Sequence, residues 1–165
     1  MSGRVLVAGI GNIFLGDDAF GVEVVHRLLA RKWPEGVLIK DFGIRGLDLA
    51  YAMMDCWDLV ILVDAISRGA DPGTLYVIEA EADERAPQAT PDAHAMTPEK
   101  VLELVRSLGG KVPRTLVLGC EPAQIGGEDG CIGLSETIEA SLEQAVREAD
   151  RLVTEALRIK AQAAA

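Results

Sequence analysis

Residues 5–21 read Val-Leu-Val-Ala-Gly-Ile-Gly-Asn-Ile-Phe-Leu-Gly-Asp-Asp-Ala-Phe-Gly, and this stretch decides the fold of the chain. Its first six residues form a short apolar run rich in β-branched side chains, which is typical of a buried strand. A glycine-rich loop and two adjacent acids, Asp17 and Asp18, follow. From Phe20 onward, apolar residues recur at helical spacing. The order of strand, glycine-rich loop, paired acids and helix predicts an α/β protein.

A glycine-rich loop between a strand and a helix often binds phosphate, so a nucleotide- or phosphate-binding module is one alternative. The dinucleotide fingerprint needs a third glycine where this chain has Phe14, and the next glycine, Gly16, comes two residues late. No Walker lysine follows, and Asp17 and Asp18 would repel an anion. Both acids could also simply complement the dipole of the following helix. A single acid would serve for that, so the pair points instead to a cation or a substrate backbone.

Length, charge and composition limit the classes of protein to which this chain can belong. The 165 residues suit a single domain, 1–165, without an internal repeat or a domain boundary. The net charge of −10 argues against nucleic acid and anionic membranes as partners. No apolar run approaches the ~18–20 residues of a membrane span, and the N-terminus lacks the layout of a signal peptide. Cys56, Cys120 and Cys131 form no C-x-x-C pair, so we expect reduced thiols in a cytoplasmic protein.

The patterns in the rest of the chain predict four more strands, for five in total, and three more helices, for four in total. Residues 65–73 are too few for a crossover helix, so the strand that follows them should run antiparallel to the third strand. Ser135 should cap the last helix, and Thr97 with Pro98 should begin the one before it. The predicted fold is a single three-layer α/β/α domain with a five-stranded, mostly parallel mixed sheet and one antiparallel strand. The expected strands are 5–10, 37–42, 59–63, 74–79 and 114–119, and the expected helices are 18–32, 47–54, 98–108 and 136 to about 160.

Three polar residues from distant segments are candidates for chemistry. Asp64 follows the most apolar strand, and the carboxyl end of such a strand is the usual place for a functional acid in an open α/β sheet. We therefore expect Asp64 to be buried beside the loop that carries Asp18, although it could instead only cap its own loop. His94 lies in a polar segment, where a lone histidine is usually just exposed. Two carboxylates and one imidazole suit a borderline divalent ion with open positions.

The motif over residues 9–22 resembles the opening motif of the NiFe-hydrogenase maturation endopeptidases. Further similarities are the pair Asp64-Ala65, a histidine shortly before a helix at His94, the pair Glu121-Pro122 and the stretch Gly-Leu-Ser at 133–135. The resemblance covers most of the chain. It implies a hydrolase, aspartic-type by family classification. The enzyme would remove the C-terminal extension of a hydrogenase large-subunit precursor after nickel insertion.

The resemblance also implies roles for particular residues. Asp18, Asp64 and His94 would be the catalytic residues and would bind the nickel ion that the precursor carries, without a resident catalytic metal. Asp41, Gly43 and Gly46 would take part in substrate recognition. Arg45 departs from the small residue that the resemblance leads us to expect there, and His26 is expected at the surface without a chemical role.

The mechanism is left open by the sequence. The chain has no H-E-x-x-H or G-x-S-x-G motif. Nickel could polarise the scissile carbonyl or activate water, or the acids could act as general base while nickel serves only recognition. A non-catalytic chaperone of the nickel-loaded subunit is the remaining alternative.

Overall fold

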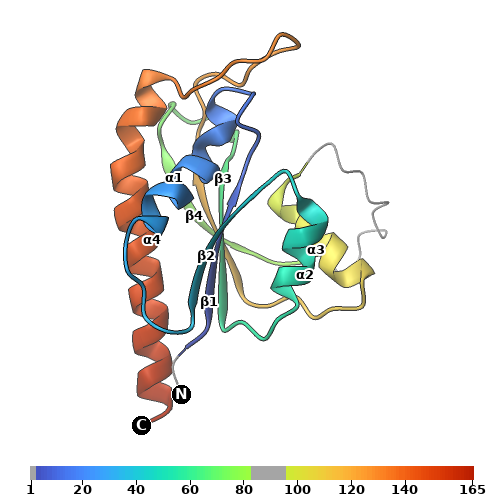
Figure 1. Ribbon diagram of the computed structural model, residues 1–165, viewed down its shortest axis with the longest axis vertical. Coiled ribbons are helices and arrows are strands. Elements are labelled where there is room, and N and C mark those ends of the chain that lie inside the picture. Colours follow the sequence, from blue (N-terminus) through green and yellow to red (C-terminus); the bar gives the residue numbers. More distant parts are fainter. Residues whose placement is uncertain (1–2, 83–95) are drawn as a thin grey trace.

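A computed structural model describes residues 3–82 and 96–165, and its chain forms a sheet with helices on both faces (Figure 1). The predicted helix over 18–32 is shorter than expected and begins with a turn of 3-10 helix, η1. The last helix is longer than expected and continues past the predicted fraying point near residue 160. In chain order the elements are β1 (Val5–Ile10), η1 (Asp17–Ala19), α1 (Phe20–Leu29), β2 (Val37–Gly43), α2 (Gly46–Met53), β3 (Leu59–Ala65), β4 (Leu75–Ala80), α3 (Pro98–Ser107), β5 (Thr115–Cys120) and α4 (Glu136–Ala163).

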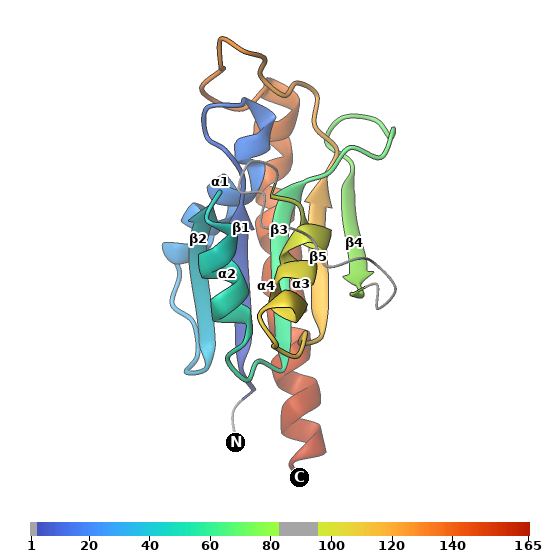
Figure 2. The same cartoon turned by 90° about the vertical axis from the view of Figure 1, so that its right-hand side faces the viewer.

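The five strands form one mixed sheet in the order β2-β1-β3-β5-β4, which confirms the predicted fold class (Figure 2). Among the described residues β4 is the one antiparallel strand, and it runs antiparallel to β3 as predicted, but its hydrogen-bonded neighbour is β5, which lies between β3 and β4. The burial of the two strands explains this order. Every residue of β5 is buried, whereas β4 alternates between half-buried and exposed residues. A fully apolar strand belongs inside a sheet, and an amphipathic one suits the edge.

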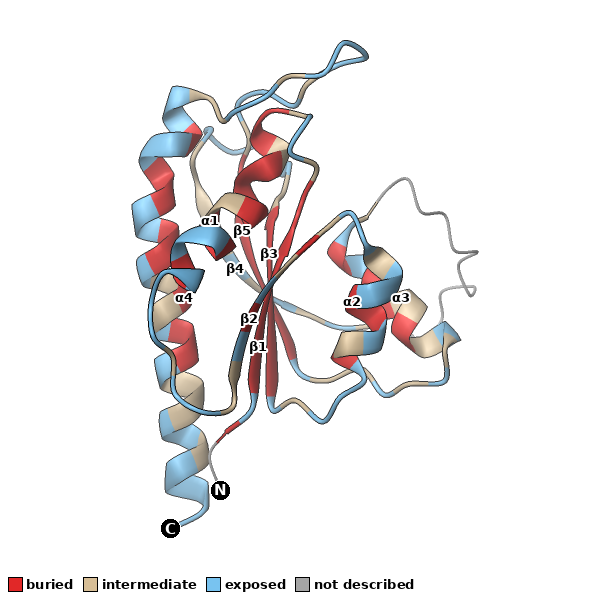
Figure 3. Ribbon diagram, viewed as in Figure 1, coloured by how far each residue is buried: buried red, intermediate tan, exposed pale blue. Residues whose placement is uncertain are grey.

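Two layers of helices cover the sheet, and strand alternation supplies each layer with its own core. On β1, Val5 and Val7 face α1 and α4, whereas Leu6, Ala8 and Ile10 face α2 and α3. Figure 3 shows the buried residues concentrated on the central strands and on the inner stripes of the helices. Among the described residues, no helix is long and apolar enough to cross a membrane.

The two predicted helix caps have different outcomes. The Oγ1 atom of Thr97 accepts a hydrogen bond from the Lys100 N–H at 3.3 Å, and Pro98 occupies the first turn of α3, as predicted. Ser135 occupies the N-cap position of α4, but its side chain makes no capping hydrogen bond. Its hydroxyl donates instead to Asp17, which makes Ser135 part of a contact between distant segments.

Close backbone packing sets the position of η1 and α1. A Cβ atom on Gly21 would lie 2.0 Å from the carbonyl oxygen of Val63 and 2.4 Å from that of Ile10. A Cβ atom on Gly11, which has a φ of +148°, would lie 1.9 Å from the carbonyl oxygen of Asp18. The helical segment therefore starts directly against the ends of β1 and β3, at a separation that only glycine permits.

We expect Gly21→Ala to lower the free energy of unfolding by about 2 kcal/mol or more, because the added methyl group meets backbone on two sides. Helix propensity alone would make the alanine variant about 1 kcal/mol more stable than the wild type. A loss of stability would therefore have to come from the clash with the backbone. Urea denaturation measures the difference. Gly127→Ala is the matched control, since nothing lies within 4 Å of the added Cβ atom. Equal stability of the Gly21 variant and the wild type would contradict the packing argument.

Candidate functional site

Asp18 and Asp64 meet at the carboxyl edge of the sheet, where β1, β2, β3 and β5 end. Asp64 is the penultimate residue of β3 and is only 5% exposed, as its position after the apolar run predicts. Asp18 lies in η1 and is half-buried, and its Oδ2 atom accepts a hydrogen bond from the Asn12 N–H at 2.8 Å. The packing of η1 against β3 thus brings together the two acids that the sequence singled out.

The surroundings of Asp64 disfavour its charged form. Burial is the main cause that raises the pKa of Asp64 well above its usual value, and the negative charge of Asp18 adds to it. Glu99, at the start of α3, raises the pKa of Asp64 further, while a hydrogen bond from the Ala65 N–H acts in the opposite direction. No lysine or arginine in the described ranges forms an ion pair with either acid. Two carboxylates of this kind favour a proton or a cation between them.

Asp17, the other member of the acid pair, has a different environment. Its side chain is completely buried, and its carboxylate accepts four hydrogen bonds from the segment 123–135. The N–H groups of Ala123 and Gln124 donate to Oδ2 at 2.9 and 2.7 Å, and the hydroxyl of Ser135 donates to the same atom at 2.9 Å. The N–H of Ser135 donates to Oδ1 at 2.7 Å. Asp17 therefore joins η1 to a segment more than a hundred residues away, a role that the sequence reasoning missed.

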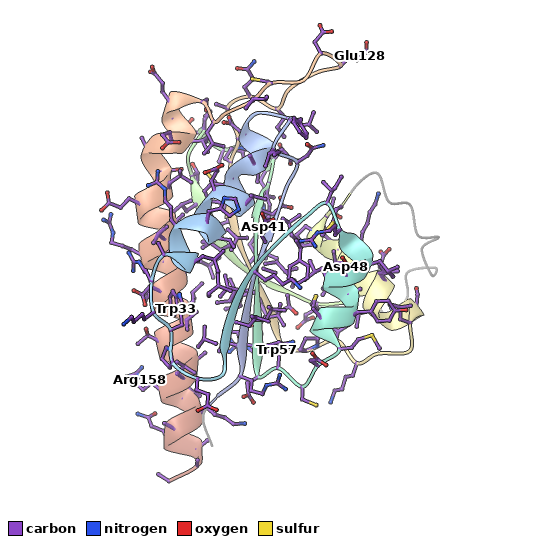
Figure 4. The ribbon with its side chains drawn as sticks, viewed as in Figure 1. Trp33, Asp41, Asp48, Trp57, Glu128 and Arg158 are labelled. Carbon is purple, nitrogen blue, oxygen red and sulfur yellow. The ribbon has the colours of Figure 1, made fainter. Side chains whose placement is uncertain are left out.

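The predicted recognition residues lie where β2 ends and α2 begins: Asp41 and Gly43 belong to the last part of β2, and Gly46 is the first residue of α2 (Figure 4, which labels Asp41). Asp41 accepts a hydrogen bond from the Gly43 N–H at 2.8 Å, and its other carboxylate oxygen lies 2.9 Å from Nε2 of His26. The carbonyl of Gly43, whose φ is +53°, accepts from the Gly11 N–H at 3.0 Å. The turn from Asp41 to Gly46 is thus attached to the same glycine loop as the acids.

Two further side chains contact this turn. His26 is exposed on α1, as expected, and its Nε2 atom lies beside the Asp41 carboxylate because one turn of α1 faces the end of β2. The unexpected Arg45 donates from its guanidinium to the carbonyls of Asp41 and Phe42, so its charge is used within the turn. Gly46 begins α2, where a Cβ atom would lie 3.3 Å from Sδ of Met96.

Glu121, part of the Glu121-Pro122 pair noted in the sequence, holds the loop between β3 and β4. Its carboxylate accepts hydrogen bonds from the N–H groups of Arg68 and Gly69 and from the hydroxyl of Tyr76. The Arg68 N–H is the largest of the influences that lower the pKa of Glu121. Glu121 therefore holds the connection between β3 and β4, and its contacts explain why an acid stands directly after β5.

The glycine loop itself is packed against the protein's own backbone. A Cβ atom on Gly9 would lie 2.6 Å from the carbonyl oxygen of Gly21, and one on Gly16 would lie 2.9 Å from that of Gln124. The space that a phosphate would need beside these glycines is filled by the chain. This packing, together with the adjacent acids, disfavours the interpretation as a phosphate site.

The thiols lack the features of a catalytic cysteine. Cys120 is fully buried, and burial raises the pKa of its thiol, so the reactive thiolate is disfavoured. Cys56 and Cys131 are free, and neither lies in a group of three or more histidine, cysteine or acidic residues that could hold a metal ion, since the described residues contain no such group. Asp18 and Asp64 are by themselves only two potential ligands, and the predicted third, His94, lies outside the described residues.

Comparisons with known proteins agree with this architecture. The sequence model of a family described as hydrogenase maturation protease matches residues 22–151. The hydrogenase 2 maturation protease of Escherichia coli is 32% identical over 149 residues, which are 88% of this chain and 87% of the relative. The structure of the hydrogenase maturating endopeptidase HybD from E. coli has a TM-score of 0.73 at 31% identity and covers 92% of this chain and 93% of its own. A hydrogenase 2 maturation peptidase from a Thaumarchaeota archaeon has a TM-score of 0.66 at 30% identity, covering 93% and 97%.

We expect Asp64→Asn to become more stable relative to the wild type as the pH rises. The pKa of Asp64 is higher in the folded protein than its ordinary value of 3.8, so the folded state retains a proton that the unfolded chain has lost. The stability that wild-type Asp64 provides is therefore complete below pH 3.8 and is lost as the pH rises toward the raised pKa. Between the ordinary and the raised pKa of Asp64, the difference in free energy of unfolding between Asp64→Asn and the wild type should grow by about 1.4 kcal/mol per pH unit.

Urea denaturation of both proteins between pH 4 and pH 8 measures this difference. Asp55→Asn removes an exposed acid in the same way and serves as the control: an equal trend in this variant would show that the effect is not specific to Asp64. A constant stability difference between Asp64→Asn and the wild type across this range would show that Asp64 titrates normally.

Proposed function

This chain belongs to the hydrogenase maturation protease family, and we propose that it removes the C-terminal extension of a NiFe-hydrogenase large-subunit precursor. The observation that carries the proposal is the pair of acids at the carboxyl edge. A buried carboxylate with a raised pKa stands beside a second carboxylate, and neither has a cationic partner within residues 3–82 and 96–165. Strongly perturbed acids in such a position are typical of functional sites.

Nickel in this proposal is part of the substrate. The precursor would bring the ion, and Asp18, Asp64 and His94 would complete its coordination, since carboxylate and imidazole both suit a borderline divalent metal. A divalent cation between Asp18 and Asp64 would offset their mutual repulsion and favour the ionised form of Asp64. Nickel-loaded precursor would therefore bind more tightly than the nickel-free form, which is a recognition mechanism based on charge.

The acids also provide a proton acceptor for hydrolysis. A carboxylate whose pKa is raised toward neutrality is a better general base than an ordinary one, and Asp64 has this property. In one version of the proposal the ion polarises the scissile carbonyl while Asp64 takes a proton from the attacking water. In the other, the ion only positions the precursor and the acids do the chemistry. Both versions require the pair of acids.

The turn from Asp41 to Gly46 would contact the precursor beside the scissile bond. It is attached to the glycine loop through the hydrogen bond between Gly11 and Gly43, so its distance from Asp18 is fixed by backbone. One carboxylate oxygen of Asp41 holds the turn and the other faces His26, which leaves little freedom of movement. A rigid turn of this kind would select a substrate by shape and by its backbone hydrogen bonds.

We expect the wild-type protein to shorten a nickel-loaded large-subunit precursor and Asp64→Asn to slow this reaction at least a hundredfold. The amide keeps the size of the side chain but neither takes up a proton nor neutralises a cation. Mass spectrometry of the precursor before and after mixing measures the loss of the C-terminal peptide. Asp55→Asn should process at the wild-type rate.

Two results that combine this assay with calorimetry would refute the proposal. Binding of the precursor by the wild type in calorimetry, without any change of precursor mass, would identify a non-catalytic chaperone. Binding of a nucleotide in calorimetry, without any effect on the precursor, would favour the phosphate-binding alternative.

We expect His94→Ala to slow processing of the nickel-loaded precursor at least a hundredfold, because the ion would lose one of its three protein ligands. His94→Gln should fail as well, since an amide oxygen is a poorer partner than imidazole for nickel. Gln88→Ala, in the same segment, is the control and should remain active. Thermal melts at matched concentration test whether each variant folds. Full activity of His94→Ala would reduce the site to the two acids.

A further inference from the structure

Two segments of the chain combine into a single ordered projection at the carboxyl edge, which we call the edge arm and define as residues 12–16 and 123–133. The N–H of Gly16 donates to the carbonyl of Cys131 at 2.7 Å, and the N–H of Cys131 donates to the carbonyl of Phe14 at 2.7 Å. The N–H of Gly126 donates to the carbonyl of Leu15 at 3.0 Å. Figure 1 shows the second segment extending beyond the sheet beside the start of α1, and Figure 4 labels Glu128 near its tip.

The edge arm exposes large apolar side chains on this ordered backbone. Phe14 is 58% exposed, Ile125 46% and Ile132 83%. Leu15 and Cys131, which pair with each other in this arm, are half-buried, and a Cβ atom on Gly126 would lie 3.1 Å from the Cβ atom of Cys131 and 3.3 Å from the Cα atom of Leu15. A cluster of solvent-exposed apolar side chains on an ordered backbone is typical of a protein interaction site.

The edge arm is continuous with the candidate active site. Asn12 links the two, because its N–H donates to the carboxylate of Asp18 while its own side-chain oxygen accepts from the Phe14 N–H at 2.9 Å. Asp17 fixes the other segment of the arm through its hydrogen bonds with Ala123 and Gln124. A ligand on the arm would therefore lie next to Asp18 and Asp64.

Charge identifies the kind of partner. The second segment of the arm, residues 123–133, contains no lysine or arginine but two acids, Glu128 and Asp129, and the chain as a whole carries a net charge of −10. A second copy of this chain would bring the same negative charge to the contact, and an anionic membrane would also be repelled. The complementary partner has apolar residues flanked by basic ones.

We propose that the edge arm is the docking surface for an apolar, basic segment of the large-subunit precursor, a proposal that rests on the proposed function. Docking on the arm places the neighbouring part of the precursor over Asp18 and Asp64. The arm supplies binding energy that does not depend on nickel, while the acids respond to the ion. The edge arm then recognises the precursor polypeptide and the acids recognise its metal, so that two adjacent surfaces contribute separately to the binding free energy.

The test measures binding of nickel-free precursor by calorimetry and processing of nickel-loaded precursor by mass spectrometry. The variant is the double substitution Ile125→Ser with Ile132→Ser, which removes two exposed side chains and leaves the acids intact. The Kd for nickel-free precursor should rise about tenfold or more, because a few central apolar residues carry most of the energy of such contacts. For the nickel-loaded precursor, KM should rise while kcat at saturation is maintained.

The control is Leu29→Ser with Ile159→Ser, two side chains that are about as exposed but lie on α1 and α4. It should leave both Kd and KM unchanged. Single variants test the charge argument: Ile132→Lys should weaken binding more than Ile132→Glu, and added salt should reduce the difference.

The outcomes of these measurements distinguish failure of the docking surface from failure of the proposed protease activity. Equal affinity of the double variant and the wild type overturns the docking surface, whatever the processing assay shows. Absence of any binding between the wild type and nickel-free precursor overturns it too, because the arm would then contribute nothing without the ion. Weakened binding together with a wild type that never shortens the precursor supports the docking surface and refutes the protease proposal.

Discussion

The position of the site depends on one steric constraint, the contact between the start of the first helical segment and the ends of β1 and β3. At Gly21 and Gly11 the backbone carbonyls of Val63, Ile10 and Asp18 occupy the space in which any other residue would have its Cβ atom. Side chains normally separate a helix from the sheet on which it packs. Without them, η1 sits against the carboxyl edge, and Asp18 comes close enough to Asp64 to affect its pKa.

The two adjacent acids show how neighbouring residues acquire opposite roles. Successive side chains on a turn of 3-10 helix point about 120° apart, so Asp17 and Asp18 cannot face the same surroundings. Asp17 turns toward four hydrogen-bond donors that satisfy its buried charge. Asp18 turns toward Asp64, where the two like charges oppose each other. One acid thus contributes to the stability of the fold, while the other contributes to an unfavourable arrangement that a cation would relieve.

Most of the fold could be predicted because local patterns carry the information. Apolar runs located the strands, helical periodicity located the helices, and the short connection before β4 predicted an antiparallel strand. The burial of Asp64 also followed from its place directly after the apolar run 59–63. The insertion of β5 between β3 and β4 could not be predicted, since strand order depends on which strands occupy the interior of the sheet, and a local pattern does not contain that information. The partners of Asp17 and Ser135 lie on distant segments, and no spacing rule connects them. The contact of His26 with Asp41 could not be predicted for the same reason, because it arises only when α1 packs beside β2.

The dipeptide of Asp17 and Asp18 also explains how docking and chemistry could be coordinated. An enzyme that binds its substrate on one surface and acts on it at another must keep the binding surface at a constant distance from the reacting groups. In this protein Asp17 holds the edge arm, Asp18 belongs to the candidate active site, and one peptide bond separates them. Peptide geometry is stiffer than any contact between side chains, so movement of the arm relative to the acids is limited to rotation about a few backbone bonds. Since Gly11 and Gly21 fix η1 on the sheet, the same glycines that bring Asp18 to Asp64 also determine where the precursor would dock.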